Sequence, residues 1–156
     1  MRRPDRPGIL PHDAAHPECA AGKTDKMDPR IKPPTDQPAI KTVMMPRDTN
    51  GEGTIFGGVI LSLMDQAAYV EACRQAYHRY VTVSFHKVEF HKPVFVGDIV
   101  TLTARTVRIG RSSIQIHVAV WAQRRSEPDV IIQVTEGEVV FVAVSADGNP
   151  IPVFPE

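Results

Sequence analysis

Asp65 is the side chain whose position in the sequence most favours chemistry. It is the only charged residue between Glu52 and Glu71, within a long apolar stretch that contains no proline and predicts a helix. It lies about nine residues into that helix, too deep to cap the first turn. Because burying an unpaired carboxylate is costly, we expect Asp65 either to act on a substrate, or to cap a neighbouring backbone group or pair with an arginine across an interface.

The pair Gly57-Gly58 stands where this helix should begin. The first N–H groups of a helix lack acceptors and carry the positive end of its dipole, and glycine lets a ligand approach them closely. Such amides suit the oxygen of a tetrahedral intermediate or of a polarised thioester carbonyl, although two glycines also serve a tight turn. Asn50, in the preceding loop, has an amide that can orient a water or a carbonyl, but asparagine before glycine is also a common turn residue.

Basic residues gather at two further places. The first is the turn after Val107, where two guanidinium groups, backbone amides and hydroxyls form a set that suits phosphate groups. An ordinary solvated hairpin tip is the alternative interpretation. The second is a small group around Lys92, with Lys87 and His91. We call the turn after Val107 the arginine turn, and its members are Arg108, Gly110, Arg111, Ser112 and Ser113.

The histidines and cysteines form no recognisable metal or nucleophile motif. Unless a bulge intervenes, strand alternation places His86 on one face and Glu89 and His91 on the other, and three ligands do not converge from that spacing. The sequence contains no HExxH, CxxC, G-x-S-x-G or phosphate-binding loop motif. Cys19 and Cys73 form no disulfide framework. We therefore expect no metal and no redox cofactor.

One long helix and five strands must position these residues. The helix is expected over residues 56–73 and is apolar nearly all round, which indicates that other structure wraps it. A change of alternation at His86-Lys87 predicts a β-bulge, and Gly137 predicts a bend. One helix against one antiparallel sheet is an α+β layer arrangement. The strands are expected over residues 40–44, 80–90, 98–109, 112–123 and 130–144.

The composition divides the 156 residues into a tail and one folded unit. Eight of the 14 prolines lie in residues 1–38, a stretch without Val, Phe, Tyr or Trp, which predicts a disordered Pro-rich tail; Met27 offers an alternative start. Residues 39–150 form the predicted domain, followed by a C-terminal end at 151–156. Lys and Arg total 18, as do Asp and Glu, so the net charge does not favour nucleic acid or a membrane surface. We see no signal peptide or membrane span, which favours a cytoplasmic protein.

Several short motifs follow one another in a specific order and spacing. They are residues 46–58 (PRDTNGEGTIFGG), Met64-Asp65, residues 81–83 (VTV), residues 90–98 (FHKPVFVGD) and residues 107–113 (VRIGRSS). Together they resemble the hotdog-fold acyl-CoA thioesterases, and most closely the YciA-type branch of acyl-CoA hydrolases. The resemblance covers about residues 40–150. Phe56 agrees with this branch, since many other relatives carry histidine before the glycine pair.

The resemblance implies a hotdog protomer, in which a curled antiparallel sheet of about five strands wraps the long central helix. It also implies a homodimer as the active unit, commonly within a trimer of dimers, with a tetramer as the alternative. Asp65 would be the catalytic carboxylate, Asn50 the catalytic asparagine from the facing subunit, and Gly57 and Gly58 the source of the amides that hold the thioester oxygen. Lys92 and the arginine turn would bind coenzyme A, which is part of the substrate rather than a cofactor.

The expected reaction is hydrolysis of an acyl-CoA to a free acid and coenzyme A. Asp65 would activate a water while the helix-start amides polarise the carbonyl, or would attack directly to give an anhydride. A non-catalytic acyl-CoA-binding hotdog protein is the alternative function, although the tail lacks the basic stripe of DNA-binding regulators. A hotdog hydratase or dehydratase would need a histidine near the active helix, and residues 53–72 contain none.

Overall fold

The computed structural model describes residues 30–32 and 35–155. Most of the predicted tail, including Met27, lies outside the described residues. Of the part that is described, Ile31 packs against the core, and the backbone N–H of Lys32 donates a 2.8 Å hydrogen bond to Gln75 Oε1. At the other end of the chain, Val153 is fully buried in the core. Contacts with the folded unit therefore extend beyond residues 39–150 on both sides.

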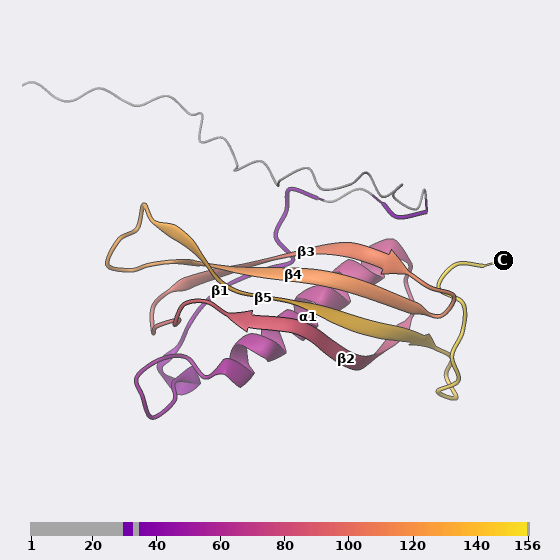
Figure 1. The fold of residues 1–156 in the computed structure, drawn as a ribbon, viewed down its shortest axis with the longest axis horizontal. Coiled ribbons are helices and arrows are strands. Elements are labelled where there is room, and N and C mark those ends of the chain that lie inside the picture. The colour runs from indigo at the N-terminus through magenta and orange to yellow at the C-terminus, as the bar shows by residue number, and fades with distance from the viewer. Residues whose placement is uncertain (1–29, 33–34, 156) are drawn as a thin grey trace, which may run out of the picture.

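One α-helix and a five-stranded sheet make up the described fold, which confirms the expected α+β arrangement (Figure 1). The sheet is antiparallel throughout and has the order β1-β3-β4-β5-β2, so β1 and β2 are its edges. Within the described residues, no helix has the length and apolarity needed to cross a membrane. The elements are β1 (Ile40–Val43), a 3-10 turn (Pro46–Asp48), α1 (Gly57–Gln75), β2 (Arg79–Phe90), β3 (Ile99–Ile109), β4 (Ser113–Gln123) and β5 (Ile131–Val144).

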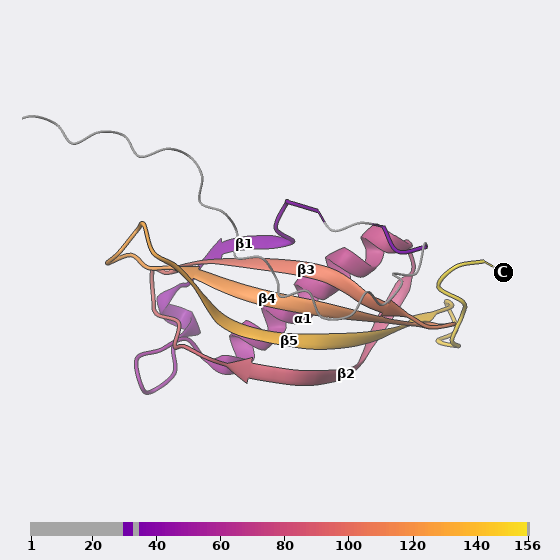
Figure 2. The ribbon, with the colours of Figure 1, turned by 45° about the horizontal axis from the view of Figure 1, so that its top comes forward.

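The core lies between α1 and one face of the sheet (Figure 2). Strand β4 alternates as expected, and inward side chains such as Ile116 and Val118 are fully buried. On the helix, Ala67, Ala68 and Ala72 are fully buried as well. Small side chains at these positions let the helix lie close to the sheet, so that the larger strand residues fill the space between the two layers.

In the single chain, the sheet covers only one side of α1, although the apolar pattern predicted a helix wrapped all round. Tyr69 and Val70 remain 41% and 48% exposed on the helix. On the edge strand β2, Val81 and Val83 are 40% and 54% exposed. Grouped exposed apolar side chains of this kind are typical of an interaction surface. The second side of the helix is therefore uncovered in the single chain.

Strand β2 is irregular where its alternation was expected to change. Its pairing with β5 shifts between His86 and Glu89, and Lys87 has a φ angle of 50°, in the left-handed region. A non-glycine residue with positive φ is uncommon and is typical of a turn or a bulge. The predicted bulge at His86-Lys87 is confirmed.

Gly137 of β5 lies opposite this bulge. A Cβ atom at Gly137 would lie 3.0 Å from Val88 Cγ2 and 3.1 Å from Met64 Cε, so a side chain there would require both neighbours to shift. Gly137 keeps its pairing with Val118 of β4, and the register of β5 with β4 runs through it without a shift. The glycine therefore serves the close approach of β2 and α1 to β5.

Candidate active site

Asp65 lies on α1 and faces the edge strand β2. Its Oδ1 accepts a hydrogen bond of 2.8 Å from the hydroxyl of Thr82. Asp65 is half-buried in the single chain, and no other group among the described residues hydrogen-bonds to it. Within one protomer the partner is thus a hydroxyl and not a backbone group, and an arginine across an interface lies outside what the single chain tests. The second carboxylate oxygen remains open to a water or a substrate.

Thr82 is a site residue that the sequence pattern did not single out. It lies between two exposed valines in β2, where a threonine fits strand propensity and needs no other explanation. Only the packing of α1 beside β2 brings its hydroxyl to Asp65. A hydroxyl that donates to one carboxylate oxygen fixes the orientation of the carboxylate and leaves the other oxygen as an acceptor. Its one signal in the sequence is its place within the VTV motif.

The helix begins at Gly57, as expected, with Phe56 as the N-cap residue. The backbone N–H of Val59 donates to Phe56 O at 2.9 Å, whereas those of Gly57 and Gly58 find no acceptor in the described part of the chain. Gly58 is exposed and Gly57 is half-buried. Two free N–H groups therefore point outward at the positive end of the helix dipole, where they can bind a carbonyl oxygen or an oxyanion.

A cavity of about 260 Å³ adjoins the helix start. Gly57 and Ile60 of α1 line it, together with Lys92 from the segment that follows β2. Its wall also includes Thr135, whose hydroxyl is fully buried and has no hydrogen-bond partner among the described residues. The cavity thus combines apolar walls with hydrogen-bond donors, as small-molecule sites do.

Asn50 uses its side chain to close its own loop. Its Oδ1 accepts hydrogen bonds from the backbone N–H groups of Glu52 at 2.9 Å and Thr54 at 3.1 Å, and its Nδ2 donates to Thr54 Oγ1 at 2.8 Å. No hydrogen bond joins Asn50 to Asp65 in the described chain. The turn interpretation of Asn50 therefore describes what it does within one protomer.

The arginine turn lies at the opposite end of the molecule from the helix start. It connects β3 to β4, with the Gly110 N–H donating to Ser113 O at 2.8 Å, and Arg108 and Arg111 are exposed. The backbone N–H of Val153 donates to Arg111 O, and Val153 O contacts His78 Nε2 at 2.8 Å, just after the end of α1. Figure 1 shows this turn on the same side as the end of α1. Within one chain, the arginine turn therefore lies far from Gly57, Gly58 and Lys92.

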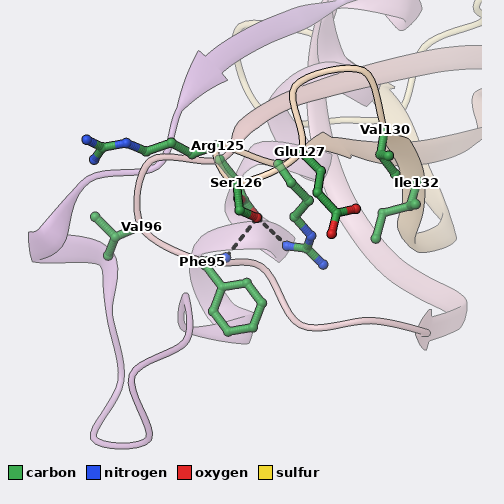
Figure 3. Close-up of a pocket in the computed structure, with 9 residues that line it drawn as sticks. Phe95, Val96, Arg125, Ser126, Glu127, Val130 and Ile132 are labelled. Carbon is green, nitrogen blue, oxygen red and sulfur yellow. Dashed lines mark hydrogen bonds and ion pairs between the residues drawn. The ribbon is translucent and has the colours of Figure 1, made fainter.

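A larger cavity, of about 650 Å³, lies beside the loop between β4 and β5 (Figure 3). An ion pair between Arg124 and Asp98 borders it, and Asp98 Oδ2 also accepts the backbone N–H of Phe95 at 3.0 Å. The Arg124 guanidinium lies 4.9 Å from the centre of the Phe95 ring, while Arg125 points away from that ring in Figure 3. Because Arg124 and Asp98 satisfy each other, they hold the segment after Lys92 in place and do not offer an open anion site.

Comparisons with known proteins place these features in a family. A family model described as Thioesterase superfamily matches residues 52–128. An uncharacterized acyl-CoA thioester hydrolase from Zymomonas mobilis is 41% identical over 133 residues, which cover 85% of this chain and 87% of that protein. The acyl-CoA thioester hydrolase YciA of Salmonella typhimurium is 40% identical over 122 residues, covering 77% and 92%. The crystal structure of a hexameric hotdog fold thioesterase from Campylobacter jejuni shares 44% sequence identity, with a TM-score of 0.69 and coverage of 74% and 90%.

A long helix against a curled antiparallel sheet, with free amides at the helix start and a carboxylate inside the helix, defines a hotdog-fold thioesterase. The identities of about 40% over most of both chains are more specific than the fold. The chain belongs to the YciA-type family of acyl-CoA thioester hydrolases. This confirms the resemblance found in its motifs.

Proposed function

We propose that this chain hydrolyses acyl-CoA thioesters, with Asp65 activating the attacking water. The observation that carries the proposal is the hydrogen bond from Thr82 to Asp65 Oδ1, which leaves Oδ2 free to accept from a water. That water loses a proton to Asp65 as its oxygen bonds to the thioester carbon. Amides at a helix start take the developing negative charge on the carbonyl oxygen. The C–S bond then breaks, coenzyme A leaves with the proton as a thiol, and the acid is released.

The amides and the carboxylate of one helix lie too far apart to act on one thioester. Gly58 and Asp65 are seven residues apart, which at 1.5 Å per residue is about 10 Å along the helix axis. The free N–H groups also point away from Asp65, toward the N-terminus of the helix. Each group must come within about 3 Å of the reacting atoms. We infer that one protomer supplies the amides and Asn50, and that its partner supplies Asp65, so that a homodimer is the active unit.

The exposed apolar surface supports such a homodimer. Antiparallel pairing of two β2 edges about a two-fold axis would join two sheets and cover Val81, Val83 and the open side of α1. A two-fold axis across the strands also exchanges the two ends of the molecule. The partner's arginine turn would then approach the end where Gly57, Gly58 and Lys92 lie, and together they would hold the phosphates of coenzyme A. Three such dimers would give a hexamer, the state described for the Campylobacter jejuni relative.

This scheme needs no cofactor, because water is the co-substrate and the protein supplies the base and the oxyanion donors. It also suits the cytoplasm, and the free thiol of Cys73 is compatible with a reducing compartment.

Release of free thiol from a series of acyl-CoAs of increasing chain length tests the proposal. The wild-type protein should turn over, and Asp65→Asn should lower kcat by about 10²- to 10⁴-fold. Asp129→Asn, which changes an exposed acid in the loop between β4 and β5, is the matched control and should retain wild-type activity. A protein that binds acyl-CoAs but releases no thiol at any chain length would instead be the non-catalytic hotdog binder.

Direct attack by Asp65 on the thioester is the rival chemical route. A single turnover in ¹⁸O-labelled water separates the two routes. General-base catalysis places the label in the released acid, whereas hydrolysis of an anhydride at the Asp65 carbonyl places it first in Asp65.

A further inference from the structure

Four side chains form a cluster on the face of the sheet that points away from α1, and one of them, His91, also lines the cavity beside the helix start. His91 Nε2 lies 3.0 Å from Glu136 Oε1, and His117 Nε2 lies 3.2 Å from Glu136 Oε2. Glu89 Oε2 lies 3.8 Å from His91 Nε2. Glu136 and His117 come from β5 and β4, while Glu89 and His91 come from the end of β2 and the residue just after it. Three neighbouring strands therefore contribute to one point on the surface.

The distances in this cluster fit a metal ion. The ligand atoms of Glu89, His91 and Glu136 all lie within 4.8 Å of one another. Ligands held at about 2.0–2.2 Å around a tetrahedral Zn²⁺ are about 3.3–3.6 Å apart, and the observed 3.0 and 3.8 Å lie on either side of that range. The Glu89 side chain is 65% exposed and can rotate inward. One imidazole and two carboxylates are a donor set for a divalent first-row ion.

The surroundings leave room and negative charge for a cation. A hollow of about 250 Å³ lies beside the cluster, lined in part by Glu89, His117 and Glu136. The nearby Lys87 ammonium forms an ion pair of 3.6 Å with Glu138, so its charge is already matched. The carboxylates of Glu89 and Glu136 have only the two histidines as ion-pairing partners among the described residues. A divalent cation there would neutralise both carboxylates.

We propose that Glu89, His91 and Glu136 bind a divalent first-row metal ion, with Zn²⁺ as the ion to test first. His117 holds the second oxygen of Glu136 and so orients this ligand from the outer shell. The bound ion links β2 to β5 on the outer face of the sheet and has a structural role, since the proposed hydrolysis does not use it. Spacing along β2 supplies only two of the ligands, and the third becomes available through pairing with β5.

Calorimetric titration of the tag-free, chelator-treated full chain with Zn²⁺ tests the site. We expect one ion per chain in the wild type. Glu136→Gln and His91→Gln should weaken binding by more than about 100-fold, and His117→Gln by about 10- to 100-fold. His86→Gln is the matched control, because His86 is an exposed histidine of the same strand that contacts Ser84 outside the cluster. It should bind Zn²⁺ as the wild type does.

Thermal unfolding gives a second measurement. Zn²⁺ should raise the Tm of the wild type and of His86→Gln progressively with concentration, and should leave the Tm of Glu136→Gln unchanged. Cooperative melting of each variant without metal shows that loss of binding is not loss of folding. Absence of Zn²⁺ binding in the wild type, or equal binding in Glu136→Gln, would overturn the proposal. Equal binding of Zn²⁺ in Glu136→Gln would mean that ligands elsewhere in the full chain hold the ion.

Discussion

The hydroxyl of Thr82 on β2 donates a 2.8 Å hydrogen bond to Asp65 Oδ1 on α1. This bond runs from the edge strand to the middle of the helix, so the orientation of the carboxylate depends on the packing of two elements. Thr82 is also exposed in the single chain, next to the apolar surface that we expect a partner to cover. Dimerisation would therefore exclude water from this hydrogen bond and strengthen it.

Replacing Thr82 tests its positioning role. Thr82→Val keeps the branched shape but removes the donor, so kcat should fall by about 10- to 100-fold while KM changes little. Thr82→Ser restores a hydroxyl and should recover most of the activity. Steady-state kinetics of both variants provide the measurement, and a Thr82→Val enzyme with wild-type kcat would rule out this role.

Mixing two inactive variants tests whether the site is shared between protomers. Asp65→Asn and Asn50→Ala are each expected to be nearly inactive. If the two residues serve one site from different chains, each mixed dimer contains one intact site. Random mixing after co-expression should then recover about a quarter of the wild-type activity. Activity that stays at the level of the separate variants would show that both residues act within one chain.

Glu71 should make the stability of the protein depend on pH. It is 3% exposed, and burial alone would raise its pKa. Hydrogen bonds from Arg74, Gln75 and Thr106, with distances of 2.7 to 2.9 Å, outweigh burial and hold the pKa of Glu71 below its ordinary value of 4.5. The folded state therefore binds this proton less readily than the unfolded state does. Its contribution to stability is full above about pH 4.5 and is lost as the pH falls through the lowered pKa.

Urea unfolding of Glu71→Gln at several pH values measures this contribution. Near neutral pH, the variant should lose about 1.5–3 kcal/mol of unfolding free energy, because the amide cannot accept all of these charge-assisted hydrogen bonds. The difference from wild type should shrink on acidification. Glu52→Gln, in an exposed loop, is the control and should match the wild type. A difference that is constant with pH would contradict the assignment.

Gly137→Ala should destabilise the fold. The added methyl group would meet Val88 Cγ2 at 3.0 Å and Met64 Cε at 3.1 Å, and the backbone Cα of Val88 lies at 3.3 Å. Overpacking of this kind costs about 1–3 kcal/mol, which thermal or chemical unfolding can measure. Gly51→Ala is the matched control, since nothing lies within 4 Å of a Cβ at that position. Equal stability of the two variants would mean that β2 moves aside easily.

The spacing of apolar residues and the positions of glycine and proline were enough to predict the helix and the strands of this fold. The helix over residues 56–73 and all five strands agree with the structure to within a few residues, and the bulge at His86-Lys87 follows from a change of alternation. Such patterns depend on which face of an element is buried, a property that neighbouring residues already carry. Asp65 was recognisable for the same reason, because a lone charge in an apolar helix is visible without any tertiary information.

Relationships between elements could not be predicted in this way. Thr82 is an unremarkable strand residue until α1 packs beside it, and Glu136 becomes a neighbour of His91 only through the pairing of β2 with β5. The distance between the arginine turn and the helix start likewise depends on topology, because strand direction decides the end of the sheet at which each turn lies. The roles of Asn50 and Lys92 toward a substrate remain predictions.

The two edges of the sheet differ greatly in length, since β2 has 12 residues and β1 has four. An unpaired edge strand is a template for further strands, and a long flat edge invites aggregation. If two β2 edges pair with each other, the joined sheet ends on both sides in a short β1. Growth by strand addition would then stop after one step, and the bulge at Lys87 would restrict β2 to few registers. The same asymmetry that favours a defined pair of subunits thus protects the protein against open-ended polymerisation.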